Sequence, residues 1–348
     1  MFTKKKINEH YKKLLLVAPP GIGDTVMLTP AIRELRKRFP TTKIYCICTK
    51  WSSDILSSDP NVDELIRLDD KKFTSKSPLN LIRLIRLLRK YHFDVAVSFL
   101  MLTWPLITYF AGIPVRVGPE LKNEGFALTK KSKYHLNKHV VENFLSVVSL
   151  LGAEITSKTP KIFLSKEDKD FSEEFITRNR LKKEKLIGIS AVGGRNPGSF
   201  TPSKIWPKEN FKELCKQLEK VYNPTFIFFG DKYDSETSEY ISKDLKKAHV
   251  LCGKTTLRQA AALIEKCNLF ITPDSGLMHI AGAVNTRVIG LFGPTNPNLY
   301  FPFSEKNRFL WKKIDCSPCF ATKEIKKCNS NRCMQAIQPE EVFNLIRF

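Results

Sequence analysis

The motif Asp274-Ser-Gly-Leu-Met-His279 gathers side chains that can bind an anion. It lies between two apolar runs, residues 269–272 and 288–292. This pattern predicts a strand, a sharp turn, a short helix and a second strand, with the polar residues at the carboxyl end of the first strand. Ligands of open α/β sheets bind at that edge, and the amides that begin a helix attract phosphate. We therefore predict a phosphate site at this Asp274 turn (residues 274–279).

A purely structural role is the alternative for the Asp274 turn. Asp and Ser commonly cap helices, glycine is common in turns, and a single histidine is more often a core residue than a ligand. Gly276, however, permits a close approach between the backbone and a ligand. The functional interpretation is favoured because a second polar turn lies far upstream, at Gly21-Ile-Gly-Asp24.

The Asp24 turn (residues 21–24) follows the apolar run 13–17. A dinucleotide-binding turn needs a third glycine and an acid at the end of the second strand, but this chain has Val26 and Thr49-Lys50 at those positions. The sequence therefore disfavours a nicotinamide enzyme. The turn instead presents the carboxylate of Asp24 at the end of a strand, where it can accept a proton from an attacking hydroxyl. A plain helix cap is the alternative role.

Composition bounds the class of protein. The 348 residues suffice for two domains, and hydrophobic and charged contents of 42% and 26% are typical of a globular protein rather than a disordered or fibrous one. The 57 Lys and Arg exceed the 35 Asp and Glu, which gives a net charge of +22. Such an excess favours an anionic partner, for which a membrane face, a phosphorylated glycolipid and nucleic acid are the candidates. A lysine-rich genome is the alternative explanation.

The sequence predicts a cytosolic protein without a membrane span. Its charged amino terminus is followed by an apolar run, residues 14–17, that is too short for the core of a signal peptide. The uncharged stretch 95–115 is long enough to raise the question of a span. Because it contains Pro105, Gly112 and Pro114 and starts like a buried strand, we expect a strand followed by an apolar loop or helix.

Strands alternate with helices in two blocks, which predicts two doubly wound α/β domains. The first domain covers residues 1–165, a charged linker or helix covers 166–185, the second domain covers 186–337, and a closing helix covers 338–348. The predicted strands are 13–17, 43–48, 64–68, 94–99, 161–164, 186–190, 225–229, 269–272 and 288–292. The predicted helices are one from the Asp24 turn to about residue 39, then 78–91, 209–221, 255–266, 276–283 and 338–346.

The two turns belong to a series of motifs that occur in a fixed order along the chain. They are Leu14-Leu-Leu-Val-Ala-Pro-Pro-Gly-Ile-Gly-Asp24, Leu28-Thr-Pro-Ala-Ile-Arg-Glu-Leu35, Pro60-Asn-Val-Asp63, residues 139–151, Lys204-Ile-Trp-Pro207, the Asp274 turn and Leu291-Phe-Gly-Pro-Thr295. In order and spacing they resemble glycosyltransferase family 9, the lipopolysaccharide heptosyltransferases. The resemblance covers nearly the whole chain. One departure is Ser190-Ala-Val-Gly-Gly194, where the family usually has a proline-glycine turn.

The resemblance implies an α/β fold of the GT-B type, with two facing Rossmann-like domains and a cleft between them. The first domain would bind the acceptor and the second the nucleotide sugar. Asp24 falls on the family's proposed general base, beside Gly21 and Gly23 on the acceptor side. The expected donor-binding residues are Lys204, Asp231, Asp274, Ser275, Gly276, His279 and Thr295. For Asp231, a helix cap is the alternative role.

The implied reaction is inverting transfer of heptose from ADP-heptose to a hydroxyl of the lipopolysaccharide inner core. Asp24 would deprotonate that hydroxyl, while Lys204 and helix amides would hold the diphosphate. These contacts strengthen as the leaving group gains charge, so we expect no metal or other cofactor in catalysis. A protein hydroxyl, as in relatives that modify autotransporters, is an alternative acceptor, and another nucleotide sugar is an alternative donor.

Nine cysteines fall into two groups. Five are expected to be small buried hydrophobes: Cys46, Cys48, Cys215, Cys252 and Cys267. The other four, spaced C-x2-C-x8-C-x4-C in a loop covering 316–333, are Cys316, Cys319, Cys328 and Cys333. This spacing is compatible with a structural zinc or iron site, and similar groupings occur in members of the family. Reduced thiols and disulfides are the alternatives.

The positive charge supports two kinds of partner. We expect it to hold the protein peripherally on the anionic cytoplasmic face of the inner membrane, through cations at 4–6, 12–13 and 83–90. A solvated helix face is the alternative for any one of these residues. A nucleic-acid-binding protein with a four-cysteine metal module is the rival function, but it leaves Asp24 and the Asp274 turn unexplained. We therefore expect no nucleic acid partner.

Overall fold

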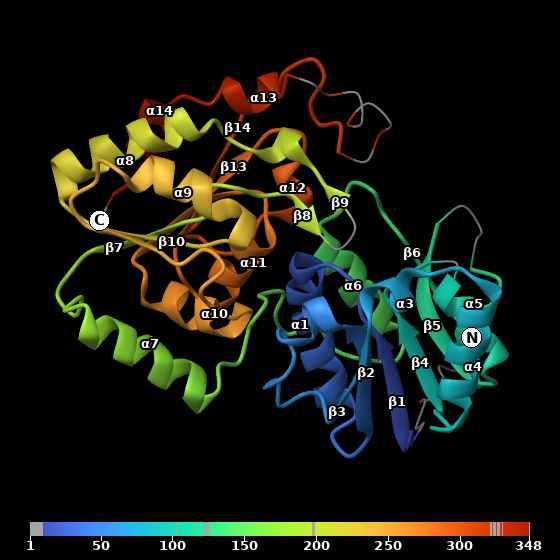
Figure 1. The fold of residues 1–348 in the computed structure, drawn as a ribbon. Helices are drawn as coiled ribbons and strands as arrows, with labels where there is room; N and C mark the ends of the chain where they lie inside the picture. The colour runs from blue at the N-terminus through green and yellow to red at the C-terminus, as the bar shows by residue number, and fades with distance from the viewer. Residues whose placement is uncertain are drawn as a thin grey trace. The chain divides into compact units, whose positions relative to one another are not determined.

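The chain divides into two units, Met1–Phe163 and Leu164–Phe348 (Figure 1). The structure, a computed structural model, describes residues 10–101, 103–121, 125–196, 199–320, 322, 325, 328 and 330–347. Lys4–Lys6, which the sequence assigns to membrane binding, lie outside the described residues. Within them, each unit contains a parallel sheet of six strands with helices packed on it, so the predicted doubly wound α/β class is confirmed.

The first unit is built on the sheet β3-β2-β1-β4-β5-β6. Its strands are β1 (Lys13–Val17), β2 (Lys43–Thr49), β3 (Glu64–Leu68), β4 (Val95–Ser98), β5 (Val115–Glu120) and β6 (Lys130–Lys133). Its helices are α1 (Ile22–Arg38), α2 (Lys50–Ser53), α3 (Asp70–Thr74), α4 (Pro78–Arg89), α5 (Thr103–Phe110) and α6 (Val140–Ser149). Alternate residues of β1 face opposite sides of the sheet, and both sides are buried.

Helices cover both faces of this first sheet. On one face, α3, α4 and α5 supply Phe73, Leu84 and Trp104 to a hydrophobic core that includes Leu15 and Val17 of β1. On the other face α1 packs against α6, as Figure 1 shows. The uncharged stretch 95–115 contains β4 and α5. In the described part of the chain, no helix is both long and apolar enough to cross a bilayer.

The second unit repeats the arrangement with the sheet β11-β10-β7-β12-β13-β14. Its strands are β7 (Leu186–Ile189), β10 (Thr225–Phe228), β11 (Ala248–Val250), β12 (Leu269–Pro273), β13 (Val288–Phe292) and β14 (Arg308–Trp311), with a separate antiparallel pair, β8 (Arg195–Asn196) and β9 (Ser199–Phe200). Its helices are α7 (Lys166–Arg178), η1 (Pro202–Lys204), α8 (Lys208–Tyr222), η2 (Lys232–Asp234), α9 (Ser235–Ser242), α10 (Leu257–Lys266), α11 (Gly276–Ala283), α12 (Pro297–Tyr300), α13 (Arg332–Gln335) and α14 (Pro339–Asn344).

Both sheets have the strand order 3-2-1-4-5-6 that is characteristic of dinucleotide-binding folds. In such a sheet the order in which strands are added reverses between strands 1 and 4, and a crevice opens at their carboxyl ends. In the first unit these strands are β1 and β4, and the Asp24 turn follows β1. In the second they are β7 and β12, and the Asp274 turn follows β12. The topology therefore puts both predicted turns at ligand-binding edges.

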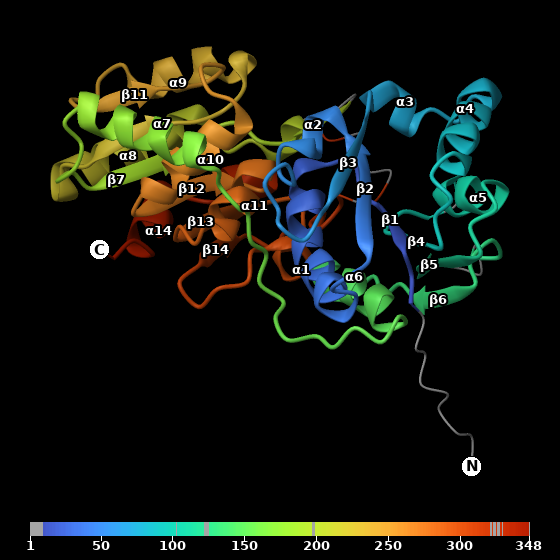
Figure 2. The same cartoon turned by 90° about the horizontal axis from the view of Figure 1, so that it is seen from below.

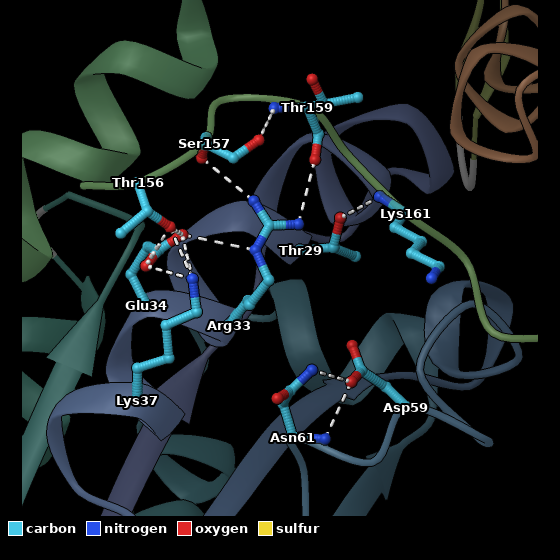
Figure 3. Close-up of polar contacts among 10 residues, drawn as sticks. All are labelled: Thr29, Arg33, Glu34, Lys37, Asp59, Asn61, Thr156, Ser157, Thr159 and Lys161. Atoms are coloured by element: carbon cyan, nitrogen blue, oxygen red, sulfur yellow. Dashed lines mark hydrogen bonds and ion pairs between the residues drawn. The ribbon is translucent and has the colours of Figure 1, made fainter. Parts of the chain in front are cut away.

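Helix α1, which carries Asp24, passes through Pro30 without ending there. A proline lacks the amide that would bond to the carbonyl four residues earlier, here that of Val26. The Thr29 hydroxyl replaces it by donating to the Val26 oxygen at 2.8 Å. The same hydroxyl accepts from the Lys161 amide at 3.0 Å (Figure 3). The helix therefore continues through Pro30 to Arg38, close to its predicted end at about residue 39.

The segment that leaves the first unit is fastened to the same helix (Figure 3). The guanidinium of Arg33 donates to the carbonyl oxygens of Ser157 and Thr159 at 3.0 and 3.2 Å, and Thr156 donates to buried Glu34 at 3.0 Å. The strand predicted at 161–164 is therefore wrong. Its first amide bonds to a side chain of α1 instead of to a neighbouring strand.

The charged segment predicted at 166–185 begins with α7, which packs on α10 of the second unit. Ser165 and Asp168 form a reciprocal capping box at its start, and Asp168 also pairs with Arg258 of α10. These contacts hold the charged helix α7 against α10. The five cysteines that were expected to be buried hydrophobes are all buried.

Candidate functional site

Asp24 lies in the first turn of α1, directly after β1. Gly21 is the N-cap residue, so the plain capping role considered for Asp24 is wrong. The Thr25 side chain closes the turn by donating to the Pro19 oxygen at 3.0 Å. A negative charge here is favoured by the positive end of the helix dipole. The turn therefore holds a carboxylate, part of whose surface is accessible, at the ligand-binding edge of the first sheet.

Tyr134, which follows β6, is a neighbour of Asp24 that sequence reasoning missed. Burial raises the pKa of its phenol, and the nearby charge of Asp24 raises that pKa further. A phenol that stays protonated can donate a hydrogen bond to a carboxylate or to a sugar oxygen. The first unit thus offers a carboxylate and a phenol at one place. No sequence motif marks Tyr134, because it belongs to a lysine-rich segment without an apolar pattern.

In the second unit, the Asp274 carboxylate is surrounded by side chains from three segments of the chain. The ammonium of Lys204, at the end of η1, donates to Asp274 Oδ2 at 2.6 Å. Thr295, in the turn after β13, donates to the same oxygen at 2.8 Å. His279 Nε2, on α11, lies 4.0 Å from Asp274 Oδ1. The structure therefore brings together four of the predicted donor-binding residues.

This cluster is buried, so its charges act through a low dielectric. Burial by itself opposes ionisation of Asp274, but the positive charge of Lys204, the nearby His279 and the bonds from Lys204 and Thr295 hold its pKa below the ordinary value of 3.8. Asp274 is therefore ionised at neutral pH and fixes the ammonium of Lys204. A buried ammonium held in this way can bind a phosphate oxygen with a strong, charge-assisted hydrogen bond.

The start of α11 provides the second element of an anion site. Ser275 is the N-cap residue, and its hydroxyl accepts from the Met278 amide at 3.3 Å. Gly276 is the first helical residue, so no side chain covers the amides there. Gly193, from the loop after β7, packs closely on this turn. A Cβ added at Gly193 would lie 3.3 Å from the backbone carbonyl oxygen of Asp274. The departure at residues 190–194 therefore lies beside the Asp274 turn.

Asp231 belongs to a different group of contacts. It is the N-cap residue of η2 and accepts from the Tyr233 amide at 2.7 Å, while Asp234 accepts from the Asp231 amide at 2.9 Å. The capping role that the sequence left open is thus present. A role of Asp231 in binding a ribose or a base stays a prediction.

The four loop cysteines are electrostatic neighbours. Burial raises the pKa of Cys333 to about 11, and the thiols of Cys316, Cys319 and Cys328 add to that rise. Among the described residues, however, no group of three or more His, Cys, Asp or Glu side chains has an arrangement that could hold a metal ion. The described side chains thus do not form a metal centre, and the predicted zinc or iron site stays a prediction.

Phe320, from the same cysteine loop, is a further member of the Lys204 cluster that the sequence did not indicate. The Lys204 ammonium lies 4.0 Å from the centre of its ring. Phe320 carries no motif and lies more than a hundred residues from Lys204, so the signal that identifies it is spatial.

Comparisons with known proteins identify the family of the chain. Residues 81–329 match the sequence profile of glycosyltransferase family 9 (heptosyltransferase). Lipopolysaccharide heptosyltransferase 2 of Salmonella typhimurium is 30% identical over 328 residues, which cover 86% of this chain and 87% of that protein. The crystal structure of a family 9 glycosyl transferase from Veillonella parvula has a TM-score of 0.79 and 25% identity, and the match covers 96% of each chain.

A second solved structure supports the fold alone. It is that of the ADP-heptose lipopolysaccharide heptosyltransferase II of Escherichia coli, with a TM-score of 0.74 and 24% identity. The match covers 96% of this chain and 97% of that one. The similarity therefore extends through both units in sequence and in structure.

Proposed function

The chain belongs to glycosyltransferase family 9, and from that premise we propose that it transfers heptose from ADP-heptose to a hydroxyl of the lipopolysaccharide inner core. The protein is a glycosyltransferase, and its two Rossmann-like units give the GT-B type fold. The observation that carries the proposal is the Lys204–Asp274 pair beside the start of α11. Relatives named lipopolysaccharide heptosyltransferases support the choice of sugar and acceptor.

The second unit is proposed to hold the donor by its diphosphate. Lys204 would bond to a phosphate oxygen while the amides at Gly276 face the same group. A hydrogen bond to a charged group contributes about 1.5–3 kcal/mol. Because a carboxylate repels phosphate, the role of Asp274 is to position Lys204. His279 and Thr295 complete the buried support of that carboxylate.

The first unit is proposed to supply the base. Asp24 would accept the proton of the acceptor hydroxyl as that oxygen attacks the anomeric carbon from the side opposite the diphosphate. The new glycosidic bond forms as the bond to the diphosphate breaks, so the configuration inverts and the electron pair leaves with the diphosphate. Lys204 and the α11 amides then stabilise the added negative charge, and the chemistry needs no metal.

We further propose that the protein binds peripherally to an anionic membrane through α4 and α5. Residues Leu79, Ile82, Arg83, Arg86 and Arg89 recur at helical spacing and are all exposed, so they form one stripe along α4. At the end of that stripe the Arg89 guanidinium donates to the Phe110 carbonyl oxygen at 2.9 Å. The stripe therefore continues onto the carboxyl end of α5, which lies beside α4 in both views (Figures 1 and 2).

The chemistry of this surface fits a lipid headgroup layer. Leu79 is 70% exposed and Phe110 is 54% exposed, which are large values for apolar side chains. Apolar residues flanked by arginines can enter the headgroup region while the cations bind anionic lipids, at about 1 kcal/mol per cation. An acceptor that is itself a membrane glycolipid would be reached from such a position.

A thermal-shift panel tests the donor assignment. The protein would be heated with ADP-, GDP- and UDP-sugars in separate samples, and ADP-heptose should raise its unfolding temperature most. A ligand at 100 times its dissociation constant stabilises a fold by about 2.7 kcal/mol. A Lys204→Met variant should lose most of that response. Stabilisation by GDP- or UDP-sugars instead would replace the donor, and no response to any of them would overturn the assignment.

A further inference from the structure

The ring of Phe320 covers the ammonium of Lys204. In the described structure this ammonium has a carboxylate oxygen of Asp274 at 2.6 Å and the centre of the Phe320 ring at 4.0 Å. Both charged side chains are at most 10% exposed. Lys204 is thus placed between one full negative charge and one aromatic face.

Backbone contacts fix the position of Phe320. The amides of Cys319 and Phe320 donate to the Pro294 oxygen at 2.9 and 3.0 Å. The next residue, Thr295, is the one that donates to Asp274. The turn that follows β13 therefore contacts both the Asp274 carboxylate and the backbone of Phe320, the two groups next to the ammonium. The far end of the cysteine loop is also attached nearby, since Asn331 donates to the oxygen of Ile205, the neighbour of Lys204, at 2.8 Å.

An aromatic ring has a particular advantage beside an anion-binding lysine. The face of the ring attracts the ammonium, and the attraction is stronger where water is excluded. Unlike a second carboxylate, the ring carries no net charge, so it does not repel a diphosphate that approaches the same ammonium. Phe320 can therefore hold Lys204 in place while leaving its positive charge available to the ligand.

We propose that Phe320 is a positioning residue for the donor site, which acts by holding the Lys204 ammonium where the diphosphate binds. This inference rests on the proposed function, because it takes Lys204 as the diphosphate ligand. Phe320 acts through Lys204, so its effect on binding must depend on that ammonium and on a phosphate in the ligand.

Calorimetric titration with ADP, and with adenosine as the ligand that lacks phosphate, tests the proposal. Phe320→Leu keeps an apolar side chain but removes the aromatic face, so the Kd for ADP should rise about tenfold. Phe320→Trp restores a ring and should bring the Kd back close to that of the unaltered protein. Binding of adenosine should change little in either variant. Melting curves would establish that both variants are folded.

Two further variants separate the proposed role from general packing. In a Lys204→Met background, Phe320→Leu should have no additional effect on ADP binding, because the ring then has no cation to hold. Tyr240 is the matched control, since its ring lies 4.4 and 4.8 Å from the ammonium groups of Lys208 and Lys212 on the surface. Tyr240→Leu should leave the Kd for ADP unchanged.

Each outcome distinguishes this inference from the function on which it rests. If the unaltered protein does not bind ADP, the donor assignment is overturned and the role of Phe320 with it. If it binds ADP and Phe320→Leu binds equally well, the role of Phe320 alone is overturned. An equal loss for ADP and adenosine, or a loss that persists in the Lys204→Met background, would show a packing role and also contradict the proposal.

Discussion

Lys204 and Asp274 lie 70 positions apart in the chain and form a buried ion pair of 2.6 Å. The pair joins the end of η1 to the turn after β12, at the carboxyl edge of the second sheet. In a buried environment each charge is stabilised by the other, because either charge alone would remain uncompensated. The pair therefore links the stability of the second unit to the geometry of the proposed diphosphate site.

Replacing Asp274 with Asn should destabilise the protein strongly. The variant keeps the shape of the side chain but leaves the Lys204 ammonium buried without its counter-charge, at a cost of about 3–5 kcal/mol. Urea unfolding would measure this change. Glu174→Gln is the matched control, because its pair with Arg178 is exposed on both sides and 3.8 Å long. The control should change the free energy of unfolding by less than about 1 kcal/mol. Equal costs for the two variants would contradict the buried-pair interpretation.

The contribution of Asp274 should disappear in acid. Its pKa is lower in the folded protein than the ordinary value of 3.8, so its contribution is present above the unfolded pKa and is lost as pH falls through the folded pKa. The difference in the free energy of unfolding between the unaltered protein and Asp274→Asn should therefore shrink as pH falls from about 5 to below 3.8. Urea titrations across this range measure it. A difference that grows in acid would mean that the carboxyl group is protonated in the folded state.

Binding to anionic vesicles tests the surface on α4 and α5. The protein should sediment with vesicles of phosphatidylethanolamine and phosphatidylglycerol, less so in high salt, and hardly with phosphatidylcholine alone. Replacing Leu79 and Phe110 with Ser should weaken binding at every salt concentration, while replacing Arg86 and Arg89 with Gln should reduce the salt dependence. Val221→Ser removes an apolar residue of α8 that is 59% exposed and serves as the control. Unchanged sedimentation of the α4–α5 variants would exclude this surface.

Elemental analysis tests the predicted structural metal. If the four loop cysteines bind zinc or iron, protein purified under reducing conditions should contain about one metal ion per chain. Cys319→Ser and Cys328→Ser should lower that content, whereas Cys215→Ser, which changes a fully buried core thiol, should not. A metal-free protein with reduced thiols would contradict the predicted metal site.

Local sequence patterns account for the parts of the fold that were predicted well. β12, α11 and β13 follow from two apolar runs separated by a polar turn with a glycine, and their predicted and observed bounds nearly coincide. β6 escaped prediction because Lys-Lys-Ser-Lys has no apolar alternation, which an edge strand does not require. The strand predicted at 161–164 failed because its amide bonds to Thr29, a partner that is distant in sequence.

The candidate site, too, could be predicted only where local motifs mark its residues. Lys204, Asp274, His279 and Thr295 could be named in advance because each lies in a motif at the end of a strand or beside one. Their mutual contacts required the three-dimensional arrangement. Tyr134 and Phe320 are brought to the two turns by tertiary structure alone.

The most direct measurement of the central claim is transfer of heptose from ADP-heptose to truncated lipopolysaccharide cores, followed by mass spectrometry of the acceptor. The unaltered protein should add one heptose to at least one core. Asp24→Asn should bind ADP-heptose as tightly but turn over about 10²–10⁴-fold more slowly, because it lacks the base. A protein that adds no heptose to any core would contradict the proposed function, and full activity in Asp24→Asn would remove Asp24 from the catalytic role.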